Sequence, residues 1–213
     1  MLDFFAILFL IVSLLMLAGR SITNHITLLC AQALALCVMA FYLGLATEEI
    51  NWHMVIVGGL TFVVKVIVLP GVLYKLVHKV KGHREVVLSV GVVSSLLIGI
   101  LLIGLTYGYI VPVLLKDIQV GGHLLSVALS SILLGCFFMI SRPSVISQLI
   151  GVVAMENGLF LCALAITGGM PLIIELGIFF DILVGVLVMA IITYQINGTF
   201  ASIDTKLLNK LKG

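Results

Sequence analysis

The sequence predicts an all-α polytopic membrane protein with seven transmembrane helices. Hydrophobic residues make up 62% of the 213 residues and charged residues only 9%, and the mean hydropathy is +1.37. This composition lies outside the range of soluble globular domains. The polar breaks between the apolar runs are too short to form a separate folded domain, so we expect one polytopic domain.

The long apolar runs define the expected helices, each near or above the roughly 20 residues that cross the hydrocarbon core. These spans are 2–19, 22–46, 53–77, 86–111, 122–140, 144–166 and 171–196. The first run opens with Asp3 rather than a basic region and lacks a small-residue cleavage motif. We therefore expect it to be a mature helix and not a signal peptide.

Basic residues gather on one side of this seven-helix topology. They are Arg20, Lys75, Lys79, Lys81, Arg84, Arg142, Lys206, Lys210 and Lys212. The other side has only Lys116, so the positive-inside rule places the N-terminus outside and the C-terminus in the cytoplasm. The basic loop from Lys75 to Arg84 is either a docking site for a cytoplasmic partner or anionic lipid, or a topology determinant alone.

The first three and last three expected helices have the features of a parallel repeat. In each unit an arginine follows the first helix, at Arg20 and Arg142, and a charge lies midway along the third, at Lys65 and Asp181. The expected segments are therefore 1–85 for the first unit, 86–121 for a connector helix, and 122–213 for the second unit and tail.

Ionisable residues inside the apolar spans are the candidate functional residues. Lys65, Glu156 and Asp181 fall near the middle of their helices, where a charge costs roughly 2.5 to 3.5 kcal/mol. At one depth, they would form a lateral relay for ions, with Gln32 near Glu156 through the repeat. Glu175 lies one turn inside the last helix on a different face from Asp181, as a link to the outer surface or an interfacial acid.

A structural role is the alternative for these charges, because paired polar residues also fix helix packing in membranes. The sequence has no nucleophile beside a base, no phosphate-binding glycine loop and no metal-ligand cluster. The cysteines lack C-x-x-C spacing and are expected to be packing residues: Cys30, Cys37, Cys136 and Cys162. We therefore expect no catalytic centre and no cofactor in this chain.

Two sets of motifs carry a resemblance to known families. The first set is Ser141-Arg142, Leu149-Ile150-Gly151, Glu156-Asn157, Asp181, Gly185, Ile203-Asp204 and Lys212-Gly213. With these, the last three helices resemble subunit K of the respiratory NADH:quinone oxidoreductase. The second set is Phe62 to Pro70, Met155 to Gly158, and Glu175 to Ile178 with Asp181. With these, nearly the whole chain is similar to component E of Hyf-type, energy-converting membrane-bound NiFe hydrogenases.

The resemblance implies a membrane-arm subunit of a prokaryotic inner-membrane complex, with the NiFe centre and iron-sulfur clusters on partner subunits. The implied partners are antiporter-like and quinone-site-like membrane subunits and a cytoplasmic hydrogenase arm, within the lipid bilayer and without nucleic acid. Two positions depart from the subunit K pattern. Val153 occupies the place of its second-helix glutamate, three residues before Glu156, and Asp181 replaces its third-helix glutamate.

The sequence is compatible with three functions. The first is ion translocation coupled to electron transfer, with Glu156 and Asp181 as protonatable stations. The second is a structural assembly subunit whose buried charges form salt bridges between chains. The third is a small subunit of a multi-subunit cation/proton antiporter, although the four additional N-terminal helices are not explained by it. A stand-alone transporter ranks last.

Overall fold

The structure is a computed structural model that describes residues 2–45, 52–79, 90–115, 122–167 and 185. In these ranges every regular element longer than one residue is a helix, and Ser21 is an isolated bridge residue. The elements are α1 (Leu2–Ala18), α2 (Ile22–Leu45), α3 (Trp52–Thr61), the π-helix η1 (Phe62–Val68), α4 (Leu69–Lys79), α5 (Val92–Leu105), the π-helix η2 (Thr106–Ile110), α6 (Val111–Leu114), α7 (Gly122–Ser141) and α8 (Val145–Thr167).

These elements make six long apolar rods. Five are long and apolar enough to cross a membrane, and α1 is an apolar helix of 17 residues. At 1.5 Å per residue α1 is about 25 Å long, close to the thickness of the hydrocarbon core. The chain thus has the helix content of a polytopic membrane protein. The expected seventh span at 171–196 lies outside the described residues apart from Gly185, which is helical.

The expected fourth helix at 86–111 is wrong at both ends where it can be compared. Residues 90 and 91 are not helical, and Gly91 precedes the helix with an extended backbone (φ −59°, ψ 152°). The rod then continues past residue 111 to Leu114, through Pro112. Apolar composition did not show where the helix starts, because residues 86–90 are also mostly hydrophobic. At the other end, the apolar run continues through Leu115 to Lys116, so the sequence allows the longer helix.

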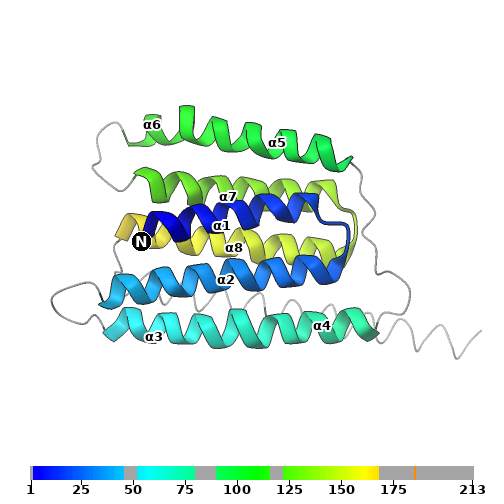
Figure 1. Cartoon of the computed structure of the whole chain (residues 1–213), viewed down its shortest axis with the longest axis horizontal. Coiled ribbons are helices and arrows are strands. Elements are labelled where there is room, and N and C mark those ends of the chain that lie inside the picture. The colour runs from blue at the N-terminus through cyan, green and yellow to red at the C-terminus, as the bar shows by residue number, and fades with distance from the viewer. Residues whose placement is uncertain (1, 46–51, 80–89, 116–121, 168–184, 186–213) are drawn as a thin grey trace, which may run out of the picture.

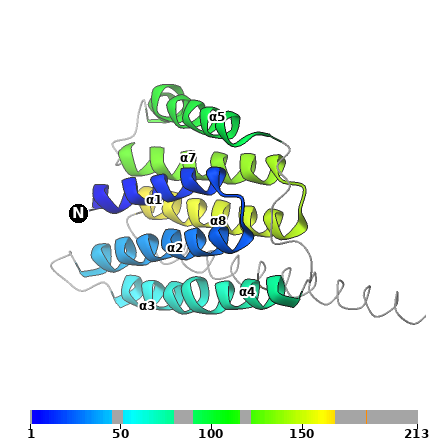
Figure 2. The ribbon, with the colours of Figure 1, turned by 45° about the vertical axis from the view of Figure 1, so that its right-hand side comes forward.

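The rods lie side by side with their long axes in nearly the same direction (Figure 1). A central group consists of α1, α2, α7 and α8, in which α1 packs on α2 and α7, and α2 packs on α8. The α5 rod lies outside this group against α1 and α7, and the α3–η1–α4 rod lies against α2 on the opposite side (Figure 2). Segments far apart in sequence therefore meet in the centre.

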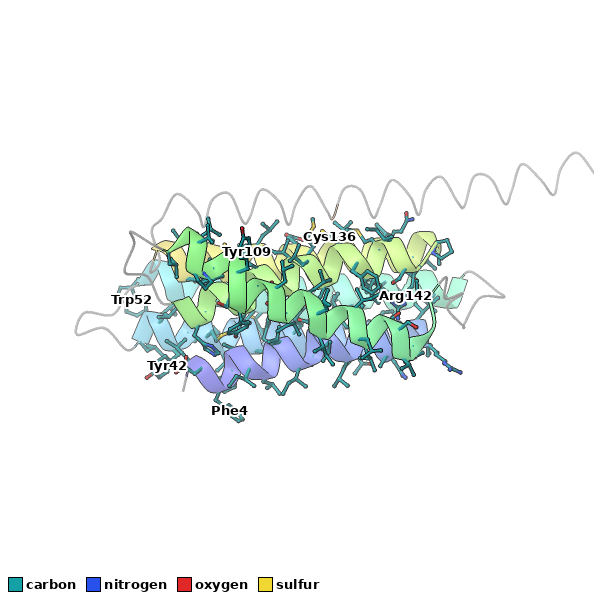
Figure 3. The ribbon with its side chains drawn as sticks, turned by 90° about the horizontal axis from the view of Figure 1, so that it is seen from above. Phe4, Tyr42, Trp52, Tyr109, Cys136 and Arg142 are labelled. Atoms are coloured by element: carbon teal, nitrogen blue, oxygen red, sulfur yellow. The ribbon has the colours of Figure 1, made fainter. Side chains whose placement is uncertain are left out.

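Charge and aromatic residues distinguish the two ends of the bundle. One end of the bundle contains the α1–α2 connection, the C-terminal half of α4 and the α7–α8 connection (Figure 1). Because these segments include Arg20, Lys75 and Arg142, we call it the basic end. Tyr42 and Trp52 lie toward the opposite end and are exposed (Figure 3). Exposed tyrosine and tryptophan near helix ends are typical of the membrane–water interface.

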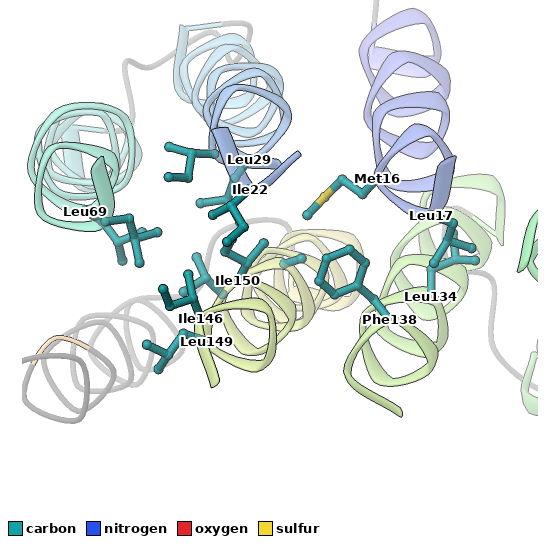
Figure 4. Packing of buried hydrophobic residues seen from close by; sticks show 14 residues of the cluster. Met16, Leu17, Ile22, Leu29, Leu69, Leu134, Phe138, Ile146, Leu149 and Ile150 are labelled. Carbon is teal, nitrogen blue, oxygen red and sulfur yellow. The ribbon is translucent and has the colours of Figure 1, made fainter. Parts of the chain in front are cut away.

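Two hydrophobic clusters fill the centre, one toward each end. The cluster nearer the basic end joins five rods and includes Met16, Leu29, Leu69, Phe138 and Ile150 (Figure 4). The other joins α1, α2, α7 and α8 around Phe9, Leu36, Met39, Val127 and Leu161. A layer of buried polar residues lies between the two clusters, at positions 13, 32, 131 and 157.

Glycines allow α7 and α8 to approach closely. A Cβ atom at Gly158 would lie 3.0 Å from the backbone nitrogen of Ile132, and one at Gly135 would lie 3.0 Å from the backbone nitrogen of Met155. Such contacts with backbone cannot be relieved by side-chain rotation. Small residues of this kind permit the close helix packing that is common in membrane bundles.

Each π-helix ends two residues before a proline, with one capping residue between them. The Leu69 N–H bonds to the Val64 carbonyl just before Pro70, and the Val111 N–H bonds to the Thr106 carbonyl just before Pro112. Proline cannot donate a backbone hydrogen bond, and its ring clashes with the carbonyl four residues earlier in an α-helix. The wider π turn accommodates both problems, and η1 contains Lys65. Lys65 thus lies in a seven-residue π segment.

Candidate functional site

The central feature of the site is an ion pair between two different rods. Lys65 Nζ lies 3.4 Å from Glu156 Oε1, and their side chains are only 1% and 6% exposed. Lys65 lies in η1 and Glu156 in α8, about 20 Å and 16 Å from the ends of their rods opposite the basic end. Two residues separated by 91 positions in sequence thus meet in the middle of the bundle.

The pair has favourable surroundings for a buried charge. The ammonium group of Lys65 also lies 5.5 Å from the ring centre of Phe160, one helical turn beyond Glu156 on α8. An aromatic face attracts a cation, and the attraction is stronger where water is excluded. Lys65 therefore meets opposite charge and an aromatic ring, both from α8.

Gln32 lies at the centre of a hydrogen-bonded network beside the pair. Its carbonyl oxygen accepts a bond of 3.1 Å from Asn157 Nδ2, and its amide nitrogen donates to Ser13 Oγ at 2.8 Å and to Ser131 Oγ at 3.3 Å. The four side chains come from α2, α8, α1 and α7. We call them the amide network. It adjoins the ion pair because Asn157 directly follows Glu156.

Lys65, Glu156 and Gln32 are thus brought to one region of the bundle, and Gln32 bonds to Asn157, the neighbour of Glu156 on α8. The other two candidate residues, Asp181 and Glu175, lie outside the described residues. The relay that would include Asp181 stays a prediction.

The sequence reasoning did not identify three members of this region: Ser13, Ser131 and Asn157. Asn157 had a usable signal, because an amide beside a buried carboxylate in an apolar span needs a partner. The serines had no such signal. Membrane helices contain many serines whose hydroxyls bond to the preceding turn, as Ser13 also does to the Phe9 carbonyl at 2.8 Å.

Arg142 has a structural role at the basic end that its charge did not reveal. Its side chain is fully buried and donates to the carbonyls of Leu17 at 2.8 Å, Gly19 at 3.2 Å and Met16 at 3.3 Å. The guanidinium also lies 4.1 Å from the ring centre of Phe138. It therefore binds the carbonyls at the C-terminus of α1, where the helix dipole favours a cation.

Burial lowers the pKa of the Arg142 guanidinium to about 10, because a low-dielectric environment disfavours the charged form. This value still leaves the group protonated at neutral pH. His25 binds the same helix end, with Nε2 3.0 Å from the Met16 carbonyl oxygen. The connection between α1 and α2 is thus locked to the connection between α7 and α8.

No site for a metal ion is found among the residues that the structure describes, where no three His, Cys, Asp or Glu side chains form a suitable group. The four cysteines are free thiols. Cys136 Sγ lies 3.6 Å from Met155 Sδ, a packing contact between α7 and α8.

Comparisons with known proteins give one relative. The chain is 28% identical to the uncharacterised protein Rv0085 of Mycobacterium tuberculosis over 211 residues, which cover 99% of this chain and 95% of that protein. No protein-family model matches the chain, and no solved structure matches it. The helix composition is that of a multi-pass membrane protein, and this relative comes from a bacterium.

Proposed function

We propose that this chain is a membrane-arm subunit of an energy-converting, hydrogenase-type complex and contributes buried charges to proton or sodium translocation. The observation that carries the proposal is the Lys65–Glu156 ion pair, which is almost completely buried in the middle of the bundle. Ionisable groups at this depth are costly and mark ion pathways in many membrane proteins.

The pair is suited to moving charge because the charge of each residue determines how strongly the other residue is held. At 3.4 Å and an effective dielectric constant of about 20, two unit charges attract by about 5 kcal/mol. Protonation of Glu156 removes this attraction and releases Lys65 toward other acceptors. Lys65 and Glu156 belong to different rods, η1 and α8. A change in the charge of one residue therefore changes the electrostatic force on a residue of the other rod.

The proposed relay continues to Asp181 in the last expected span, with Glu175 nearer the outer surface. In the proposed topology the basic end faces the cytoplasm. The complex places this chain beside antiporter-like and quinone-site-like membrane subunits. The NiFe centre and the iron-sulfur clusters would lie in the cytoplasmic arm, on other chains.

Co-purification tests the assignment to a complex. The chain is affinity-tagged, extracted in a mild detergent and analysed by mass spectrometry together with the proteins that accompany it. Recovery of a NiFe hydrogenase large subunit and antiporter-like membrane subunits is the expected result. Recovery of cation/proton antiporter subunits without a hydrogenase would replace the proposal with the antiporter alternative.

A structural assembly role is the second candidate, and the amide network favours it. Interhelical hydrogen bonds of this kind hold membrane helices together, with or without ion flow. Glu156→Gln separates the two roles because it removes the titratable group and keeps the shape. Loss of coupled ion transport in a fully assembled complex supports translocation, whereas reduced complex yield with intact coupling supports assembly. Asp3→Asn, which changes an exposed acid to an amide, is the matched control.

A further inference from the structure

A second pair of titratable side chains lies near the end of the bundle opposite the basic end. The hydroxyl of Tyr107 in η2 is 3.3 Å from Nδ1 of His123, the second residue of α7. The two rings are tilted against each other, with centroids 5.9 Å apart. Neither residue belongs to the ion pair or to the amide network. These two groups therefore do not explain why Tyr107 and His123 lie at the contact between the α5 rod and α7.

A line of polar residues runs along α7 from this pair to the amide network. Ser126 and Ser130 follow His123 by three and seven positions, which returns the helix to nearly the same face. Ser131, the next residue, lies about 100° around the helix from Ser130 and is the α7 member of the amide network. The line from His123 to Ser131 descends about 12 Å into the bundle at 1.5 Å per residue.

Unsatisfied polar atoms mark this line at successive depths. His123 Nε2 and Ser130 Oγ are buried with no hydrogen-bond partner in the described part of the chain, and so is Asn157 Oδ1 in the amide network. Ser130 is 0% exposed and, unlike Ser126, does not bond to the preceding turn. A buried polar group without a partner is costly, and bound water is the usual way in which proteins satisfy it.

We infer that the line from Tyr107 and His123 through Ser126 and Ser130 is a hydrated proton path that connects the end opposite the basic end with Glu156. This inference rests on the proposed function, because it supplies the route by which protons reach the ion pair from that side. Its ligand is water, bound at the unsatisfied atoms of His123, Ser130 and Asn157.

The chemistry of the Tyr107–His123 pair suits the mouth of such a path. An imidazole accepts a proton at one ring nitrogen and releases a proton from the other, so a proton passes through the ring without leaving it charged. Nδ1 meets the Tyr107 hydroxyl, and Nε2 is the atom without a protein partner among the described residues. Ser130 lies about 10 Å further along α7, so a chain of several waters that begins at Nε2 would carry the proton toward Ser130 and the amide network.

Water access is tested with matched cysteine variants in a chain whose four native cysteines are replaced. Ser130→Cys lies on the proposed path. Ala128→Cys is the control, because residue 128 lies on the same helix and is also 0% exposed. It lies at the contact with α8, where a Cβ atom at Gly158 would be 3.2 Å from its carbonyl oxygen. The probe is Ag⁺, added from the side opposite the basic end to the assembled protein in membranes. The remaining thiols are counted by mass spectrometry after maleimide labelling.

The expected result is that the thiol of Ser130→Cys reacts many times faster than that of Ala128→Cys. Equal rates at the two positions would overturn the path, whatever the function of Glu156. This measurement needs no ion transport, so its outcome does not depend on the proposed function.

Use of the path by protons is tested with His123→Leu in the assembled complex. We expect proton translocation to slow several-fold and to recover when a small diffusible weak acid such as hydrazoic acid is added, since a merely structural defect is not rescued by a proton carrier. Unchanged translocation in His123→Leu, alongside loss in Glu156→Gln, would overturn the path and leave the proposed function standing. Normal translocation in Glu156→Gln would overturn the proposed function instead.

Discussion

Lys65 and Glu156 form a buried ion pair, 3.4 Å apart, that joins the π-helical part of one rod to the middle of α8. Breaking such a pair leaves an uncompensated charge, which costs about 3 to 5 kcal/mol, whereas removing both charges is often nearly neutral. We predict that Lys65→Met and Glu156→Leu each lower the thermal unfolding temperature in detergent, and that the double variant recovers most of the loss. Additive losses in this double-mutant cycle would show that the two residues are not coupled.

Arg142 holds the C-terminus of α1 through three backbone carbonyls. We predict that Arg142→Ala destabilises the protein by about 2 to 4 kcal/mol, since it leaves buried acceptors unpaired and a void beside Phe138. Arg142→Lys should restore only part of the loss, because an ammonium group cannot reproduce the planar fork of donors. Chemical denaturation in detergent measures both.

Arg20→Ala is the control for that prediction, because Arg20 is an exposed arginine at the same end of the bundle. It should leave stability almost unchanged. A loss in Arg20→Ala as large as that in Arg142→Ala would mean that positive charge at this end, and not the capping geometry, is what matters.

Gly158 determines how closely α7 and α8 approach. We predict that Gly158→Ala destabilises the pair by about 1 to 3 kcal/mol, because the new methyl group would lie 3.0 Å from the Ile132 backbone nitrogen. Gly104→Ala is matched to it, since no atom lies within 4 Å of a Cβ at Gly104. That control should be neutral or slightly stabilising. Thermal unfolding of the two variants side by side gives the comparison, and equal effects would refute the packing argument.

Gln32 connects three other helices through its amide. Gln32→Leu should cost about 1 to 3 kcal/mol, because Asn157 Nδ2 loses its acceptor in a buried position. Thr27→Val on the same helix removes only an exposed bond from Thr27 Oγ1 to the Thr23 carbonyl, so it should have little effect. If the two substitutions prove equally mild, as measured by the denaturation midpoint, the amide network does not stabilise the bundle.

The sequence was sufficient to predict the rods and the depth of the central charges. A long apolar segment in a bilayer forms a helix because its backbone hydrogen bonds must be satisfied within the segment. Accordingly, α1, α2, α7 and α8 begin and end within about two residues of their expected positions. The pairing of Lys65 with a particular acid depends on how the rods are arranged, and hydrophobicity does not encode this. The depth of Lys65 and Glu156 followed from helical rise, whereas their contact required the structure.

The role of Arg142 was also beyond sequence reasoning. An arginine after an apolar helix is normally read as a topology signal at the membrane surface. Arg142 can be buried because carbonyls at the C-terminus of α1 accept its hydrogen bonds. One of these carbonyls belongs to Leu17, which lies 125 positions before Arg142 in the sequence. The same applies to Ser130, whose lack of a partner is visible only when the neighbouring rods are in place.

In the proposed function, Glu156 titrates during ion translocation while it is paired with Lys65. The decisive quantity is the ratio of protons translocated to hydrogen formed by the proposed hydrogenase-type complex. It is measured in proteoliposomes with Glu156→Gln, and with Asp3→Asn as the control. We predict that Glu156→Gln assembles and still forms hydrogen, but that its proton translocation falls by a factor of about 100 or more, as expected when a proton-transferring group is removed. An unchanged ratio in the fully assembled Glu156→Gln complex would contradict the account.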